Sequence, residues 1–281
     1  MTNEEFERLA LILARHIDNL QRVAYTWSED IDAMFEAYEA RVLVAIEEAY
    51  EKCVSTGTLT YARISALRKL RERLSAIRND CYEEIEEYVE GEVRKLAVNE
   101  AKFHMEWVFL LYALQGGAKP RLHSITQEGI DSIRKYGLYN GQTIKDIYAK
   151  ILASDIERRQ SRFNLAVQEN RLVPDLRLEL AKASVQTRRQ LQLNTVAIAN
   201  GVSNDVSVIL EQRNQDAIHG VMWITALDDR VCASCARHEG TVFYDGDEPP
   251  CPLHVNCRCH LVPVTRELKD EIASAAHARQ E

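Results

Sequence analysis

Residues that could bind a metal ion gather in one short window of the chain, residues 231–260. Five of the seven cysteines lie there. Cys232 and Cys235 are separated by two residues, and His254 and Cys257 repeat that spacing. Such pairs let two ligands reach one ion from a tight turn, and zinc takes four sulfur or nitrogen ligands in tetrahedral geometry. The window therefore predicts a structural zinc site that holds one ion.

The window offers more ligands than one zinc ion needs. Our first set is Cys232, Cys235, His254 and Cys257. Cys259 follows two residues later and, in an extended strand, points to the same face as Cys257, so either cysteine could complete the tetrahedron. Two interpretations without zinc stay open. The thiols could pack in a reduced hairpin, or a disulfide could form after release into an oxidising medium.

The pattern of the window does not match a catalytic metal site. A catalytic zinc keeps an open position beside a general base. The sequence has neither His-Glu-x-x-His nor the deaminase combination of His-x-Glu with Pro-Cys-x-x-Cys. The stretch between the two ligand pairs is acidic and rich in turn residues, whereas a DNA-reading zinc finger carries a basic helix there. We therefore expect no enzymatic activity and no small-molecule substrate.

Three residues near the cysteines are interpreted as structural support. Asp228 and Arg230 could form a salt bridge across the hairpin and fix the entry to the first cysteine pair. A contact with a partner protein is the alternative for these two charges. Trp223 lies on the preceding strand, and we expect it in the core of the small domain, where it would shield the metal.

Outside the window, few residues suggest chemistry. His16 and His104 lie in helical patterns, and no second ligand is spaced to join either, so we expect surface or packed histidines. Basic residues concentrate only in "RRQSRF" (158–163) and "TRRQ" (187–190). These stretches could touch DNA phosphates, but acidic residues flank both of them.

The segments that precede the window are predicted to be helical. In residues 3–53, apolar side chains recur every three or four residues and form one stripe, which contains Phe6, Leu9, Leu13, Ile17, Leu20 and Val23. A helical pattern resumes over 59–115 after an interruption by Ser, Thr and Gly. A helix of about fifty residues spans about 75 Å. Residues 1–115 are therefore expected to form an extended hairpin of long helices, or helices that break.

The rest of the chain divides into a helical middle region, 116–219, and a small C-terminal domain, 220–281. In the middle region we expect one helix to end at Gly201 and a separate short helix to follow. "VMWITALDDR", "GTVFY" and "CRCHLVPV" are typical of strands, and "TRELKDEIASAAHARQ" of a terminal helix. The predicted fold class is mainly α, with an extended long-helix N-terminal region, a helical middle and a C-terminal α+β domain built on a zinc-stapled β-hairpin.

Charge and hydropathy exclude some function classes. The net charge is −8, and residues 1–100 carry 21 Asp and Glu against 13 Lys and Arg. An acidic N-terminal region is a poor surface for DNA phosphates and suits a solvated helical face or a basic protein partner. The sequence has no apolar run long enough for a bilayer and does not begin like a secretory signal. We expect no membrane contact and folding in a reducing cytoplasm.

The run from Trp223 to Pro263 resembles the C-terminal domain of the Mu F-like minor head proteins of tailed bacteriophages, also called phage head morphogenesis proteins. The pattern in that family is Trp-x-Thr, Asp-x-Arg-x-Cys-x-x-Cys, a hairpin with glycine, then Pro-x-His-x-x-Cys-Arg-Cys and a final proline. The matching residues are Trp223, Thr225, Asp228, Arg230, Cys232, Cys235, Gly240, His254, Cys257, Arg258, Cys259 and Pro263. Cys251 is an extra cysteine, and Val255 stands where many members carry proline.

The resemblance implies a minor capsid protein of the virion, made in the host cytoplasm and located at the inner head and portal vertex. The partners that it implies are the portal and the major capsid protein, with packaged DNA as a further contact. It implies a role in head morphogenesis, including DNA packaging or ejection. Two alternatives come from other classes: a nucleic-acid-binding zinc protein, and a hydrolase or transferase that uses the metal.

Overall fold

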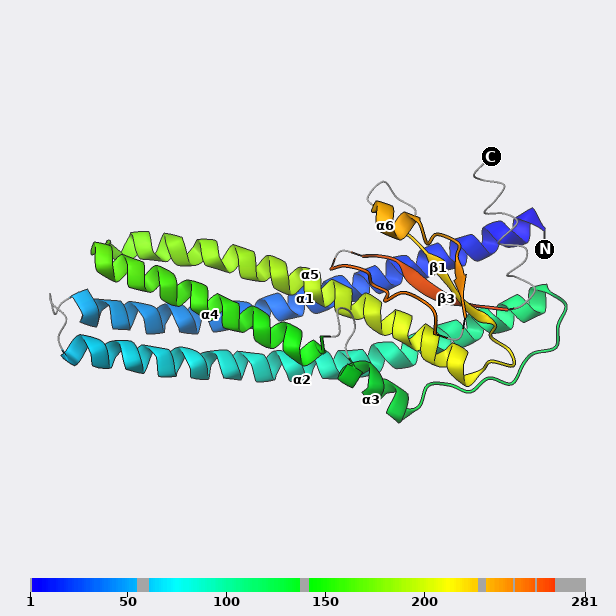
Figure 1. The fold of residues 1–281 in the computed structure, drawn as a ribbon, viewed down its shortest axis with the longest axis horizontal. Helices are drawn as coiled ribbons and strands as arrows, with labels where there is room; N and C mark the ends of the chain where they lie inside the picture. Colours follow the sequence, from blue (N-terminus) through cyan, green and yellow to red (C-terminus); the bar gives the residue numbers. More distant parts are fainter. Residues whose placement is uncertain are drawn as a thin grey trace. The chain divides into compact units, whose positions relative to one another are not determined.

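The computed structural model describes residues 2–54, 61–136, 142–226, 231–244, 246–255 and 257–265. Their elements are α1 (Asn3–Val54), α2 (Tyr61–Leu114), α3 (Gln127–Tyr136), α4 (Ile144–Glu169), α5 (Val173–Arg213), β1 (Gly220–Ile224), α6 (Ala233–Ala236), β2 (Val242–Phe243) and β3 (His260–Val264) (Figure 1). The mainly α fold class with a small sheet near the C-terminus is confirmed. Asp228, Arg230 and the predicted terminal helix lie outside the described residues.

The chain divides into two compact units, and each unit is assembled from segments that are distant in sequence. Unit 1 consists of Met1–Thr26, Glu90–Ile144 and Thr195–Glu281, and unit 2 consists of Trp27–Val89 and Lys145–Asn194. Helices α1, α2 and α5 therefore contribute residues to both units. The sequential division at 115/116 and 219/220 stays a prediction.

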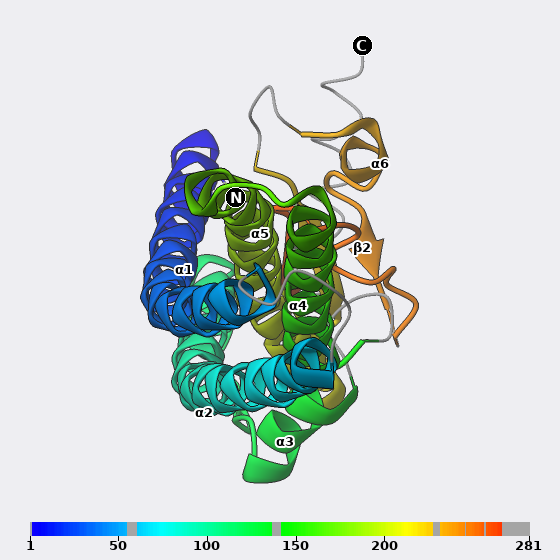
Figure 2. The ribbon, with the colours of Figure 1, turned by 90° about the vertical axis from the view of Figure 1, so that its left-hand side faces the viewer.

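Unit 2 is a bundle of four helical segments, taken from α1, α2, α4 and α5. Ion pairs link α1 to α2, α2 to α4 and α5 to α1, through Arg41–Asp80, Lys145–Glu86 and Arg177–Glu47. Figure 2 shows these four segments from one end, grouped around a shared interior. The Tyr38 hydroxyl of α1 donates a hydrogen bond of 2.8 Å to Asp155 of α4 across that interior.

The helices form because apolar side chains recur at helical spacing and are buried together. In α1, Trp27, Ile31, Phe35, Tyr38 and Val42 are all at most 2% exposed. Steps of three or four residues place them on one face, and each such side chain contributes about 1.5–3 kcal/mol when fully buried. None of the helices in the described ranges combines the length and the apolar character that a bilayer crossing requires.

Helix α5 runs without interruption through Gly201, so the predicted helix end at this residue is wrong. A glycine inside a helix costs roughly 0.5–1 kcal/mol relative to alanine. Buried side chains on both sides of the glycine outweigh that cost, because Ile198, Val202, Val206 and Leu210 are all fully buried in unit 1. A single helix therefore replaces the two that the sequence predicted.

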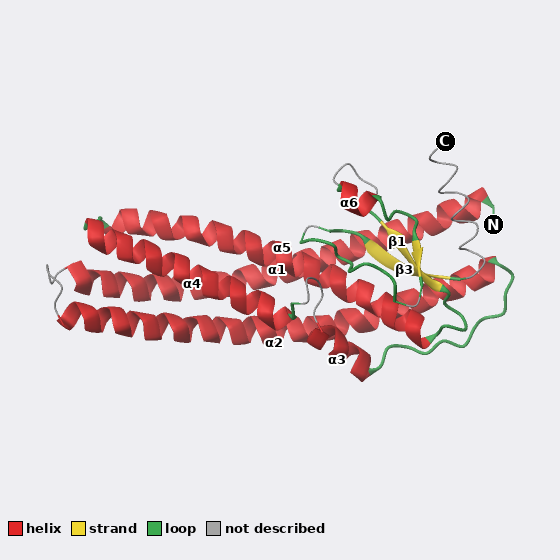
Figure 3. Cartoon of the chain, in the orientation of Figure 1, coloured by secondary structure: helices red, strands yellow, loops and turns green. Residues whose placement is uncertain are grey.

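The three predicted strands are present, and they form an antiparallel sheet in the order β2-β1-β3 (Figure 3). Val221 of the central strand pairs with Phe243 on one side and with Pro263 on the other. Pro263 is tolerated because β3 is an edge strand, and its carbonyl accepts a 2.9 Å hydrogen bond from the Trp107 indole. Gly220 has φ +149°, and a Cβ there would lie 2.4 Å from the Phe243 carbonyl oxygen, so a larger residue does not fit.

Candidate metal centre

The first cysteine pair lies at the start of the short helix α6. Cys232 is the N-cap residue of this helix, and its Sγ accepts a hydrogen bond of 3.4 Å from the backbone N–H of Cys235. This hydrogen bond stabilises the thiolate and lowers the pKa of Cys232 to about 7. Because the thiolate is the form that binds metals, the turn prepares Cys232 to act as a ligand near neutral pH.

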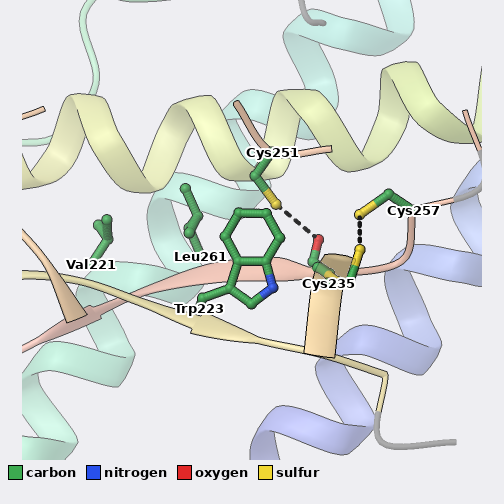
Figure 4. Close-up of a cluster of buried hydrophobic side chains, with 7 residues drawn as sticks. Val221, Trp223, Cys235, Cys251, Cys257 and Leu261 are labelled. Atoms are coloured by element: carbon green, nitrogen blue, oxygen red, sulfur yellow. Dashed lines mark hydrogen bonds between the residues drawn. The ribbon is translucent and has the colours of Figure 1, made fainter. Parts of the chain in front are cut away.

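His254 joins Cys232 and Cys235 in a group of three potential ligands, and Cys257 lies beside Cys235. His254 Nε2 lies 3.2 Å from Cys232 Sγ and 3.4 Å from Cys235 Sγ. Cys235 Sγ lies 3.6 Å from Cys257 Sγ (Figure 4). Ligands at zinc bond lengths of 2.0–2.3 Å sit about 3.4–3.8 Å apart at the corners of a tetrahedron. The three measured separations lie close to that range. Cys232, Cys235 and His254 form one group whose ligand atoms all lie within 4.8 Å of one another, whereas Cys257 groups with Cys235 and Cys259. Three donor atoms thus fit one zinc ion, and Cys257 is the nearby candidate for the fourth position.

Cys259 competes with Cys257 for the fourth ligand position. The sulfur atoms of Cys235, Cys257 and Cys259 all lie within 4.8 Å of one another, and all three residues are buried. Hydrogen bonds from Cys251 and Cys259 hold the pKa of Cys257 well below its usual range. The contact with Cys257 raises the pKa of Cys259. Cys257 and Cys259 therefore share one thiolate charge through their contact, and either sulfur can take the fourth position.

The extra cysteine, Cys251, occupies a different position. Its Sγ accepts a 3.1 Å hydrogen bond from Asn204 Nδ2 and donates one of 3.5 Å to the Cys259 carbonyl oxygen (Figure 4). Burial raises the pKa of this thiol well above its usual value. Within the described residues, Cys251 belongs to neither of the two cysteine groups that could hold an ion. It is therefore a packed thiol behind the ligands.

Trp223 forms one wall of the site. Its side chain is completely buried, and its ring centroid lies 5.1 Å from that of His238 and 6.5 Å from that of Phe243. It belongs to a core cluster with Val221, Cys235, Cys251, Cys257, Cys259 and Leu261 (Figure 4). The indole keeps water away from the buried sulfurs, which strengthens interactions with a bound ion.

Asn204 of α5 holds the two segments that carry the later cysteines, a role that our sequence analysis missed. Its Nδ2 donates to the carbonyl oxygens of Cys251 and Cys259 at 3.2 and 3.3 Å. Its Oδ1 accepts a 2.8 Å hydrogen bond from the backbone N–H of Leu261. The buried amide of Asn204 therefore links α5 to the loop that carries Cys251 and to the segment from Cys259 to Leu261 at the start of β3.

Two further side chains extend this contact along the same helix. Asn200 Nδ2 donates to the Cys257 carbonyl oxygen at 2.9 Å, and Ser207 Oγ donates to the Leu261 carbonyl oxygen at 2.6 Å. Asn200, Asn204 and Ser207 follow the spacing i, i+4, i+7 on one helix face, and we call them the α5 polar stripe. A polar stripe within an otherwise apolar helical stretch is the sequence signal that could have revealed it.

Three arginines of the basic stretches, which were predicted as possible phosphate contacts, pair with carboxylates inside unit 2. Arg159 is completely buried and bonds Asp155 at 2.6 Å. Arg162 pairs with Glu179, and Arg188 pairs with both Asp32 and Glu39. These guanidinium groups neutralise neighbouring carboxylates, which leaves little of their charge for DNA.

The family described as Phage Mu protein F like protein matches residues 130–262. The match begins in α3 and ends in β3, so it contains the α5 polar stripe and the candidate ligands. Among curated proteins and among solved structures, no significant match to the chain was found. The buried polar helix face, the small sheet and the two ligand pairs thus lie in one recognised stretch of sequence. Residues 130–262, just under half of the chain, are therefore similar to the family described as Phage Mu protein F like protein.

Proposed function

We propose that the chain is a non-enzymatic minor head protein that acts in head morphogenesis, bound near the portal on the inner side of the phage head. The family match over residues 130–262 is the observation that carries this proposal, because that family belongs to the phage head. The portal and the major capsid protein are the partners that we propose, with a role in DNA packaging or ejection.

We also propose that Cys232, Cys235, His254 and Cys257 hold one structural zinc ion. The donor set suits zinc, and three separations of 3.2–3.6 Å between neighbouring donors are those of a zinc tetrahedron. Cys257, which contacts Cys235, would move toward Cys232 and His254 to complete the ligand set. The sheet has strands of five, two and five residues, too little to build a stable core alone. A bound zinc ion supplies folding free energy to such a small module. Cys259 then lies behind the ligands and can replace Cys257 if that sulfur is lost.

The surroundings of the ligands support a structural metal rather than a catalytic one. Four protein donors leave no open position for a water molecule or a substrate. Glu239, a carboxylate near the cysteine turn, accepts a 2.6 Å hydrogen bond from the Thr225 backbone N–H. Its oxygen is thus engaged in holding the loop. X-ray absorption on the zinc-loaded protein should give four sulfur or nitrogen ligands, and a water oxygen in the zinc shell would contradict this.

The charge distribution supports a protein partner over DNA as the main contact. Residues 1–100 have a clear acidic excess, and Arg159, Arg162 and Arg188 of the basic stretches are paired with carboxylates. A phosphate backbone is repelled by such a surface, whereas a basic protein face is attracted. This pairing weakens the alternative of a nucleic-acid-binding zinc protein.

The proposal is tested by co-purification and by imaging. The tagged full chain is expressed with the portal protein or, separately, with the major capsid protein. The portal protein should stay bound to it on the affinity resin and through gel filtration. The portal protein alone on the same resin is the control. A reconstruction of procapsids should then place the chain at the portal vertex. Retention of DNA at moderate salt with no retention of either head protein would overturn the proposal.

A further inference from the structure

Three potential metal ligands meet in unit 1, on helices α1 and α2, outside the cysteine site. His16 Nε2 lies 3.0 Å from Glu100 Oε2, and His104 Nε2 lies 3.7 Å from the same oxygen. All three donor atoms lie within 4.8 Å of one another. His104 is packed, as predicted, at 1% exposed. No sign of a second ligand beside either histidine was visible in the sequence, because the fold brings together residues that are 84 positions apart.

The arrangement of the three residues is one that a metal ion can occupy. Glu100 and His104 are four residues apart on one helix, which places both on the same face. Nitrogen and oxygen ligands at about 2.0–2.1 Å from zinc are roughly 3.3–3.4 Å apart in a tetrahedron, and the two measured separations bracket that value. The imidazole centroids of His16 and His104 are 6.0 Å apart with the rings inclined at 70°, so the rings do not block each other.

The charge balance of the group favours a cation. The Glu100 side chain is 5% exposed, and its recorded ion pairs in the described part of the chain are with His16 and His104. Burial raises the pKa of Glu100, but the hydrogen bond from His16 and the charges of the two histidines outweigh it and leave the pKa lowered. Burying a carboxylate is costly unless positive charge lies beside it, and a divalent cation would supply more positive charge than the two imidazoles.

Neighbouring polar groups provide the outer contacts that metal ligands usually have. Ser203 Oγ donates a 2.5 Å hydrogen bond to Glu100 Oε2, and Ser207 Oγ lies 2.9 Å from His104 Nε2. The Ser203 contact orients the Glu100 carboxylate as outer contacts orient metal ligands. Because the Ser207 hydroxyl donates to the Leu261 carbonyl, it accepts from His104 Nε2, and a metal ion at this nitrogen would replace that hydrogen bond. The His16 side chain is 12% exposed, which gives an ion a route from the solvent.

A third histidine adds an independent indication. His260 is 2% exposed, and neither of its ring nitrogens has a hydrogen-bond partner among the described residues. It interacts electrostatically with both His16 and Glu100. Buried polar atoms are almost always hydrogen-bonded in native proteins, so an unpartnered imidazole beside this group indicates that a component of the site is missing.

We propose that His16, Glu100 and His104 bind a divalent transition-metal ion such as zinc, at a second site distinct from the cysteine site. Two imidazoles and one carboxylate are borderline and hard donors, which suit Zn²⁺, Co²⁺ and Ni²⁺. The bound ion joins α1 to α2 within unit 1 and neutralises the buried carboxylate. The site does not depend on the proposed function in the phage head or on the presence of zinc at the cysteines.

The first experiment counts metal ions in the full chain. The protein is stripped with a chelator, reloaded with zinc, freed of excess metal and analysed for zinc content. The wild type should hold two equivalents, and His16→Gln should hold one. His219→Gln is the matched control, because this half-buried histidine of unit 1 contacts Tyr244 and lies outside the group. It should keep two equivalents. Circular dichroism checks that each variant keeps its helix content.

The second experiment separates this site from the cysteine site. The double variant Cys232→Ser/Cys235→Ser should still bind one Co²⁺ ion, and its spectrum should lack the near-ultraviolet thiolate-to-cobalt charge-transfer band. Adding Zn²⁺ should raise the Tm of this double variant and leave the Tm of the triple variant with His16→Gln unchanged. If the double variant binds no metal, or if His16→Gln changes neither stoichiometry nor Tm, the second site does not exist. The loss of zinc from the cysteines alone leaves this result unaffected.

Discussion

The four-helix bundle of unit 2 and the cysteine module, which we define as residues 220–265, fill their interiors differently. The bundle buries large side chains such as Trp27, Phe35, Tyr148 and Phe163, each at most 2% exposed. Four of the seven residues in the core cluster of the module are cysteines. Apolar area stabilises in proportion to the surface that it buries, so a small thiol-rich core contributes little by itself. The bundle can be stable through packing alone, whereas we propose that the module also needs bonds to an ion.

The substitution Cys235→Ser tests this contrast most directly, because it should unfold the module and leave the bundle intact. Cys235 belongs to both cysteine groups, so its loss removes a ligand whichever sulfur takes the fourth position. We expect the loss of about one zinc equivalent and rapid hydrogen exchange throughout residues 220–265, because structural zinc sites supply most of the folding free energy of small modules. Exchange in the bundle helices should stay unchanged. Hydrogen-exchange mass spectrometry with zinc analysis measures both.

Cys81→Ser is the matched control for that change. Cys81 is 2% exposed in unit 2, as buried as Cys235, and burial raises the pKa of its thiol to about 12. The variant should keep all of its zinc and lose only stability in the bundle. A Cys235→Ser protein that holds its full zinc content and keeps the module protected would refute the proposed staple.

The second prediction tests the bundle through its buried charges. Asp155 and Arg159 are both completely buried. Asp155 accepts hydrogen bonds from Tyr38 at 2.8 Å and from Thr187 at 2.6 Å. Asp155→Ala leaves the buried Arg159 guanidinium with only the more distant Glu39 carboxylate, 3.5 Å away. Breaking a buried pair costs about 3–5 kcal/mol, and we expect a loss near the lower end of that range. Urea unfolding followed by helix signal should show this loss equally with and without chelator.

Arg177→Ala is the comparison for the buried pair. Arg177 also pairs with a carboxylate, Glu47, but its side chain is 59% exposed. Water screens exposed pairs, so this change should alter the unfolding midpoint far less than Asp155→Ala does. A chelator-dependent effect of Asp155→Ala would show that the stability of the bundle depends on metal, and the contrast between the two regions would then fail.

The features that could be predicted from the sequence are those that depend on local patterns. Long helices follow from apolar residues at steps of three or four, and the ligand pairs follow from their spacing along the chain. The prediction failed where burial overrides local preference. Gly201 looked like a helix end, but the buried side chains around it keep α5 continuous.

The contacts that hold the candidate sites could not be predicted because they join distant segments. Nothing near His16 in the sequence indicates that Glu100 lies 3.0 Å away, since that distance depends on how α1 packs against α2. Asn204 looks like an ordinary polar residue until its amide is seen to bond the backbone of Cys251, Cys259 and Leu261. Only the fold supplies such information.

The prediction with the smallest expected effect concerns Asn204, at the contact between α5 and the cysteine module within unit 1. Asn204→Ala removes the amide that holds three backbone groups of the module. Leaving buried backbone groups without a partner costs about 1–3 kcal/mol, and losing an outer contact of a metal site typically lowers metal affinity roughly 10- to 100-fold. Competition with a chromogenic chelator should therefore show weaker zinc binding although all ligands remain. Asn194→Ala, on the same helix but in unit 2, should leave the affinity unchanged.

If Asn204→Ala also leaves zinc affinity unchanged, the ligands position themselves without the helix. If affinity falls, the ion and the α5 polar stripe stabilise the module together, and packing against the helix contributes to a site that ligand bonds alone would not hold.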